Sequence, residues 1–175
     1  VGYEYTGKHH RIFANLILFL QNLKLPHIVM ANPNSSGALN SLHRLLLFKR
    51  IESSLYAFYT SLQNIKARGE ELKSEIATEE WGKVLEKYNQ SMLEKEEDSA
   101  LLLEARDKTG EDKEAQLLSK EDVLRWIDDD RKAIDEFIST YFHPLMKDKA
   151  DPLSLDDPKM DAFLHTLLGI RKKVL

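Results

Sequence analysis

The stretch that most constrains this chain spans residues 42–65 and reads LHRLLLFKRIESSLYAFYTSLQNI. Its apolar side chains recur every three or four positions, a period that places side chains on one face of an α-helix. These positions are Leu45, Phe48, Ile51, Leu55, Phe58, Leu62 and Ile65. The spacing therefore predicts one long helix that buries this face against the rest of the chain. Gly69 is a suitable residue to end it.

Length and composition fit one helical domain. The chain has 175 residues, of which 42% are hydrophobic and 31% charged, enough for a sizeable core with solvated helix faces. No uninterrupted apolar run approaches the roughly 18 residues of a membrane span. Without cysteine there is neither a disulfide nor thiolate chemistry, which favours a cytoplasmic protein. The chain has no starting Met and no cleavable signal pattern, so we expect a fragment of a longer protein.

Charge is distributed unevenly along the sequence. Residues 1–68 carry eight Lys and Arg against two acids, whereas residues 69–175 carry 17 against 27. The basic part includes the 42–65 stretch, where a polyanion would be attracted because each neutralised phosphate releases counterions. The alternative is a basic surface that pairs with the acidic remainder. The acids are densest near residues 94–116, where we expect a mobile break in the helices.

Helical signals also lie on both sides of this central stretch. Residues 8–23 follow helical spacing, and this helix is expected to end at Leu25 because Pro26 disfavours the helical conformation of its predecessor. Residues 31–37, ANPNSSG, have the composition of a loop. Residues 70–108 favour a further helix, with Thr78 as its N-cap and with an apolar stripe of Trp81, Leu85, Tyr88 and Met92.

Two more helices are predicted in the C-terminal half. Residues 119–122 resemble a capping box that opens a helix, and His143–Pro144 ends it. Asp157–Pro158 opens a last helix, and Gly169 ends it or lies close to its end. Residues 173–175 then look like a strand cut at its start. The predicted fold class is all-α, with three to five mostly antiparallel amphipathic helices and a truncated strand at the C-terminus.

Candidate metal and acid–base residues lack the spacing that a shared site requires. His9 and His10 are adjacent, so their side chains point in different directions on a helix, and no further ligand lies at suitable spacing. Asp128, Asp129 and Asp130 are consecutive and fan around a helix instead of converging on one ion. We therefore predict neither a metal centre nor a catalytic carboxylate pair.

Four parts of the sequence resemble one family. Residues 47–58, LFKRIESSLYAF, resemble the L-x-K-R-[LI]-E-S-S-x-x-A-F segment of bacterial and archaeal SWI/SNF-type superfamily two helicases. Residues 126–130 resemble a W-x-x-D-D helix of that family. Residues 157–167, with Asp157 and Lys159, resemble its D-x-K-x-x-x-L-x-x-x-L helix before the second motor lobe. Residues 173–175 match the start of that lobe's first strand.

The resemblance implies the helical region between two RecA-like motor lobes, neither of which is in this chain. The parent would be an ATP-dependent helicase or translocase that uses ATP and Mg and moves on duplex DNA. This chain has no G-x-x-x-x-G-K-[ST] loop and no D-E-x-H box, so it is not expected to hydrolyse ATP alone. The candidates for DNA-backbone contact or docking on a motor lobe are Arg44, Lys49 and Arg50. The remaining family-motif residues are Glu52, Ser53 and Ser54.

A second hypothesis needs no motor. The chain would then be a helical protein–protein interaction module whose exposed apolar stripes bind a partner helix, while the acidic half keeps it in solution. In the first hypothesis the isolated fragment exposes apolar surface that the motor lobes cover. For that reason we expect the fragment to self-associate.

Overall fold

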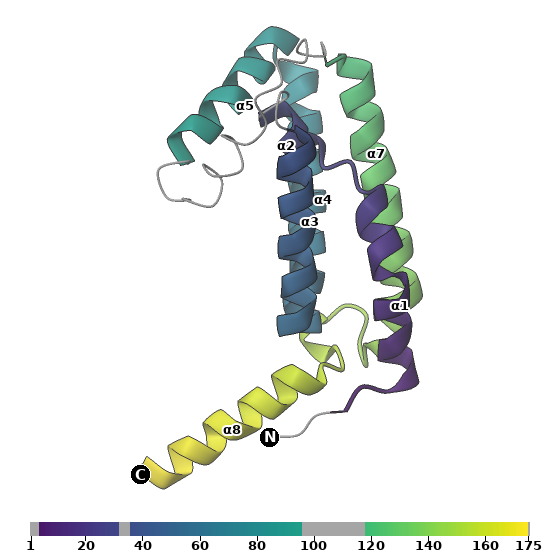
Figure 1. The fold of residues 1–175 in the computed structure, drawn as a ribbon, viewed down its shortest axis with the longest axis vertical. Coiled ribbons are helices and arrows are strands. Elements are labelled where there is room, and N and C mark those ends of the chain that lie inside the picture. Colours follow the sequence, from purple (N-terminus) through teal and green to yellow (C-terminus); the bar gives the residue numbers. More distant parts are fainter. Residues whose placement is uncertain (1–3, 32–35, 96–117, 175) are drawn as a thin grey trace.

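A computed structural model describes the backbone of residues 4–31, 36–95 and 118–174 (Figure 1). It contains the α-helices α1 (Gly7–Asn22), α2 (Pro26–Ala31), α3 (Ser36–Ser53), α4 (Leu55–Thr78), α5 (Trp81–Lys95), α7 (Lys120–Phe137) and α8 (Pro158–Val174). A π-helical turn, η3 (Ile138–Phe142), and two 3₁₀ turns, η4 (His143–Leu145) and η5 (Pro152–Ser154), follow α7. The predicted all-α class is confirmed, with six long helices in the described ranges instead of three to five.

The long helices form an elongated bundle in which neighbours run antiparallel (Figure 1). Helix α3 packs beside α4, α4 beside α7, and α1 against α7 and η3. Helix α8 diverges from one end of this bundle, and α5 lies across the other end. The main core joins α1, α3, α4, α7 and η3. Its fully buried members include Ile12, Leu16, Ile51, Leu55, Phe58, Leu62, Ile134 and Phe142.

A second, smaller core lies where α2 and α5 meet the far ends of α4 and α7. Its buried members are Met30, Leu72, Ile76, Val84, Val123 and Ile127. Trp81, Leu85 and Tyr88 pack against it, as the spacing of the 70–108 stretch predicts. Met92, the next residue of that predicted stripe, has its side chain outside the described residues.

The predicted single helix over residues 42–65 is wrong, because the chain breaks at Ser54. This residue has extended backbone angles (φ −165°, ψ 138°), and its Oγ accepts a hydrogen bond from the Ala57 amide. A serine in this conformation is a favourable N-cap, so α3 ends and α4 begins as a new helix. The apolar stripe survives the break, since all its members except Leu45 and Phe48 are buried. Leu45 is 51% exposed.

Two other expected helix boundaries are wrong. Gly69 lies inside α4, where an added Cβ would stand 3.3 Å from Cγ2 of Ile127. The missing side chain permits close packing of α4 on α7, which explains a glycine inside a helix. Thr78 does not cap α5. Its Oγ1 donates to the carbonyl of Ser74 in the last turn of α4.

Two other predicted helix boundaries lie close to those in the structure. Helix α1 ends before Pro26, and Leu25 has a positive φ of 51°. The Ser119 Oγ accepts from the Asp122 amide 3.0 Å away and caps α7. At the C-terminus, α8 continues past Gly169 to Val174, so Gly169 does not end the helix, and residues 173–174 are helical where the start of a strand is expected. Residues 32–35 of the predicted loop and 96–116 of the acidic break lie outside the described residues.

The segment Gly7–Met30 is long and apolar enough to cross a membrane, with a mean hydropathy of 1.4. Within the bundle, however, Ile12, Leu16 and Leu20 of this segment are buried in the main core. A core helix meets the same criteria of length and composition as a membrane span. The cytoplasmic location stays a prediction.

Candidate nucleic-acid interface

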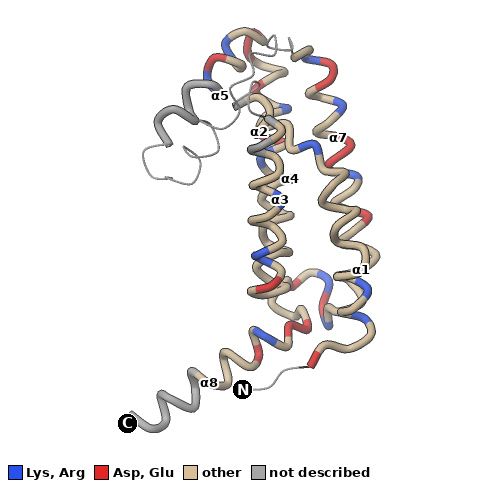
Figure 2. The backbone as a smooth tube through the Cα atoms, viewed as in Figure 1, with Lys and Arg blue, Asp and Glu red and all other residues tan. Residues whose placement is uncertain are grey.

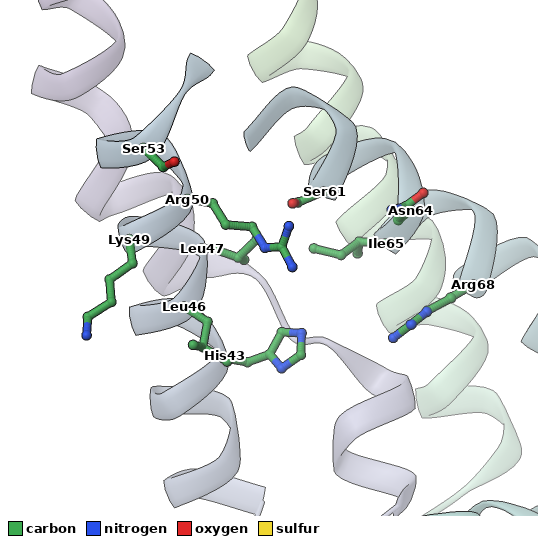
Figure 3. A pocket seen from close by; sticks show the side chains of 10 residues that line it. All are labelled: His43, Leu46, Leu47, Lys49, Arg50, Ser53, Ser61, Asn64, Ile65 and Arg68. Carbon is green, nitrogen blue, oxygen red and sulfur yellow. The ribbon is translucent and has the colours of Figure 1, made fainter. Parts of the chain in front are cut away.

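A basic cleft of about 460 Å³ lies between α3 and α4 (Figure 3). Lys49, Arg50 and Arg68 contribute positive charge to its wall, and His43, Ser53 and Ser61 contribute further polar groups. The guanidinium of Arg50 and the ring of His43 point into the space from α3, while Arg68 reaches into it from α4. Lys49 lines the rim and points away from the centre.

The positive charge of this cleft is not balanced from within the described protein. None of the described residues that line the cleft is acidic, and among the described residues neither Arg50 nor Arg68 forms an ion pair. On the neighbouring α4–α7 face, cations do have partners: Lys66 pairs with Asp135, Lys73 with Asp128, and Arg131 with Glu70. Figure 2 shows acids and bases interspersed along α7. The α3–α4 cleft is therefore a place where an external anion would be attracted.

Two histidines extend the polar wall inward. Burial lowers the pKa of His43, and the nearby charges of Arg68 and Arg50 lower it further. His27 of α2 meets His43 edge to face, with ring centroids 6.1 Å apart. Burial, followed by the influence of His43 and Arg68, lowers the pKa of His27 to about 3. Both rings are therefore neutral near pH 7, and in the cleft only the Lys and Arg side chains carry charge.

The predicted site residues separate into two groups. Lys49 and Arg50 line the cleft, as does Ser53. Arg44 does not, because it donates from Nη2 to the carbonyl of Leu23, 2.8 Å away, and so fastens α3 to the turn after α1. Arg44 is thus a structural residue in this fold.

Sequence reasoning missed Arg68 as a cleft residue. It lies four positions after Asn64 and seven after Ser61, a spacing that places all three on one face of α4. The signal was present in the sequence. The expectation of one continuous helix obscured it, because residues 50 and 68 would then lie far apart along one helix axis. In the structure they face each other from two antiparallel helices, α3 and α4.

A buried junction joins α4 to the start of α8. The carboxylate of Asp157 accepts hydrogen bonds at Oδ2 from the Ser54 hydroxyl, 2.6 Å away, and from the Tyr56 amide, 2.9 Å away. Its Oδ1 accepts from the Met160 amide in the first turn of α8. Lys159 donates to the carbonyl of Glu52 at the end of α3. The residues resembling E-S-S and D-x-K thus contact each other across about a hundred positions of sequence.

The three consecutive aspartates Asp128, Asp129 and Asp130 lie in different surroundings on α7. Asp130 is buried and accepts hydrogen bonds from the amides of Lys24 and Leu25, each 2.7 Å away. Burial raises its pKa against the opposing effect of these two bonds. Asp129 is exposed. Asp130 therefore holds the turn between α1 and α2.

His9 is likewise structural. Its ring is fully buried, with Nδ1 bonded to the amide of Thr6 and Nε2 lying 3.0 Å from the carbonyl oxygen of Asp156. His10, the adjacent residue, is exposed. Within the described ranges, no group of three or more His, Cys, Asp or Glu side chains is arranged to hold a metal ion.

Comparisons of this chain with protein-family models, curated proteins and solved structures give no match. The site must therefore be interpreted from its own chemistry and from the motif resemblance.

Proposed function

We propose that this chain is a non-catalytic helical part of an ATP-driven nucleic-acid motor. More specifically, we propose that it connects the two motor lobes of a SWI/SNF-type helicase or translocase, and that the α3–α4 cleft contacts the phosphate backbone of duplex DNA. ATP and Mg would bind to the lobes and not to this chain.

The unbalanced positive charge of the cleft carries this proposal. Two arginines from different helices face one open space, with no acidic side chain among the described residues of its wall. Guanidinium groups bind phosphate oxygens through two parallel hydrogen bonds, which makes arginine well suited to this contact. Contacts of this kind position a protein on DNA without reading its sequence. That is the behaviour a translocating motor requires.

The family-like segments supply a second line of support. Lys49 and Arg50 belong to the segment resembling K-R-[LI]-E-S-S, and they line the cleft. Ser54 of the same segment binds Asp157 of the segment resembling D-x-K. The resemblance selects these two segments independently, yet a buried hydrogen bond joins them. A change in either segment would leave a buried polar atom of the other without its partner.

The test is salt-dependent binding of the whole chain to a fluorescent DNA duplex. Arg50→Ala/Arg68→Ala should weaken binding and make the plot of log K against log salt less steep by about 1.8, since each phosphate contact contributes about 0.9 to the slope. The matched control is Arg11→Ala/Arg125→Ala, which removes two exposed arginines outside the cleft. Equal losses in both double variants would contradict a specific contact at the cleft, and no binding at low salt would contradict the DNA contact altogether.

The apolar face of α8 favours the alternative of a protein-interaction module. Phe163 is 58% exposed and Leu164 is 48% exposed, on a helix that diverges from the bundle (Figure 1). Large apolar side chains gathered on one helix are typical of a binding surface. Both hypotheses predict that the isolated chain self-associates, but in this one the association depends on the α8 face, so Phe163→Ser/Leu164→Ser should return the chain to a monomer in sedimentation experiments. Self-association that persists unchanged in this double variant would count against the alternative.

A further inference from the structure

We propose that the α3–α4 cleft is a proton-linked oxyanion site, in which Arg50 and Arg68 hold one tetrahedral phosphoryl group and His43 gains a proton as the anion binds. This inference rests on the phosphate contact proposed above. It adds the form of the bound group and a dependence on pH that a diffuse basic surface would not have.

The arrangement of the two arginines favours a discrete site. Arg50 approaches from α3 and Arg68 from α4, and both side chains are exposed enough to meet a ligand (Figure 3). The buried Ser61 also lines the wall between them. A tetrahedral oxyanion can accept hydrogen bonds from both guanidinium groups at once, whereas chloride cannot bind in this bidentate way. A volume of about 460 Å³ leaves room for the rest of a phosphodiester chain.

His43 provides the link to protons. Arg50 on its own helix and Arg68 on α4 are the charged groups that act on it, and the ring of His27 faces it from α2. Among the described residues lining this space there is no carboxylate to favour the imidazolium. A bound dianion would offset the positive field of the two arginines and would therefore raise the pKa of His43. The protonated ring then becomes a further donor to the anion.

The direction of the pH effect follows from linkage. If the anion complex binds a proton more tightly than the free protein does, affinity must rise as pH falls through the range where His43 titrates. A single linked proton changes affinity by at most about tenfold per pH unit. His27 does not contribute above pH 5, because its pKa is about 3. We expect sulfate to bind roughly three- to tenfold more tightly at pH 5.5 than at pH 7.5.

Inorganic sulfate is the probe, because it stays a dianion over this range whereas a phosphate monoester titrates near pH 6. Calorimetric titration of the whole chain with sulfate, at constant ionic strength set by sodium chloride, should show saturable binding. Arg50→Ala/Arg68→Ala should abolish it, and Arg11→Ala/Arg125→Ala should not. His43→Gln should retain binding at pH 7.5 but lose the increase at pH 5.5. Circular dichroism of each variant verifies that it remains folded.

The outcomes separate this inference from the proposed function. Duplex DNA binding without saturable sulfate binding would overturn the discrete site, while the proposed DNA contact would stand. Sulfate binding without DNA binding would uphold the site for small phosphate-bearing ligands and contradict the DNA contact. Sulfate affinity that is equal at both pH values in the wild-type chain, or an equal increase at low pH in His43→Gln, would overturn the proton link.

Discussion

Two neighbouring regions of the α3–α4 pair differ in whether their polar groups have partners within the protein. At the junction with α8, Asp157 has both oxygens occupied by hydrogen bonds, and Ser54 both donates and accepts. In the cleft alongside, Arg50 and Arg68 have no ion-pair partner among the described residues. Since buried polar groups are costly unless bonded, the junction is what folding requires. The exposed arginines of the cleft form no such bonds among the described residues, which leaves them open to the anion proposed above.

Asp130 repeats the behaviour of the junction at another place. It is buried, it belongs to a family-like segment, and it accepts two backbone amides from the turn after α1. Asp130 and Asp157 therefore both form hydrogen bonds that hold together segments distant in sequence. The contrast predicts that changes at the junction reduce stability, whereas changes to the cleft arginines reduce only binding.

The largest effect should come from Asp157→Ala. The substitution removes three hydrogen bonds to a carboxylate and leaves the Ser54 hydroxyl and the Tyr56 amide without this acceptor. We expect the free energy of unfolding to fall by about 3 kcal/mol in urea titrations, since bonds to charged groups and the loss of a helix cap each contribute on the order of 1–3 kcal/mol.

The control for this change is Asp129→Ala, which removes an exposed carboxylate on α7. It should change the free energy of unfolding by less than about 0.5 kcal/mol, as surface substitutions usually do. If the two variants were equally stable, the hydrogen bonds of the junction would not contribute to folding stability as their geometry indicates.

The next largest effect concerns pH and His27. Its pKa is about 3 in the folded chain and about 6.5 when unfolded, so between these values the unfolded chain binds more protons. Stability from this residue is complete above pH 6.5 and falls as pH is lowered toward 3. The expected loss at pH 5 is about 2 kcal/mol, because 1.5 pH units correspond to that free energy.

His27→Leu should remove this loss at little cost near pH 7. The Nε2 atom of His27 is buried without a hydrogen-bond partner among the described residues, so leucine sacrifices no such bond. Unfolding free energies of wild type and variant, measured in urea at pH 7.5 and pH 5.0, give the comparison. A wild-type loss at pH 5.0 that persists unchanged in the variant would assign the acid sensitivity to other groups.

A smaller effect is expected from Lys159→Ala. The ammonium donates to the Glu52 carbonyl at the end of α3, on the solvent side of the junction. We expect the free energy of unfolding to fall by about 1 kcal/mol, the net value of one partly exposed hydrogen bond. Lys132→Ala, on the exposed face of α7, is the control. If the free energy of unfolding fell as much as in Asp157→Ala, the lysine would stabilise the junction as strongly as the carboxylate, contrary to this prediction.

Local sequence patterns predicted the helical class, the caps at Ser119 and Asp157 and most of the buried stripe, because these depend on neighbours in sequence. The break at Ser54 could not be predicted in this way. Its hydroxyl donates to Asp157, about a hundred residues away, and this bond compensates for interrupting a strong helical pattern. The prediction that Gly69 ends a helix is wrong for a similar reason. A tertiary contact, the close packing of α4 against Ile127, decides this position.

The candidate site was predicted in part. Lys49 and Arg50 stand out as a cationic pair in a segment with few acids, but a sequence does not show which cations have partners. Arg44 has the same chemistry as Arg50, yet it is committed to the Leu23 carbonyl. Arg68 joins the cleft only because α3 and α4 fold back on each other. Tertiary structure decides both outcomes.

The smallest effect on stability should come from the residues with the largest effect on binding. Arg50→Ala/Arg68→Ala should unfold within about 0.5 kcal/mol of wild type in urea titrations at low salt. The lost packing of two exposed side-chain stems is offset by relief of repulsion between like charges across the cleft. Adding sulfate should then stabilise the wild type and Arg11→Ala/Arg125→Ala, but not the cleft variant, since a ligand stabilises only the state that binds it. A cleft variant that lost several kcal/mol without sulfate would instead make these arginines part of the fold, and the contrast with the junction would disappear.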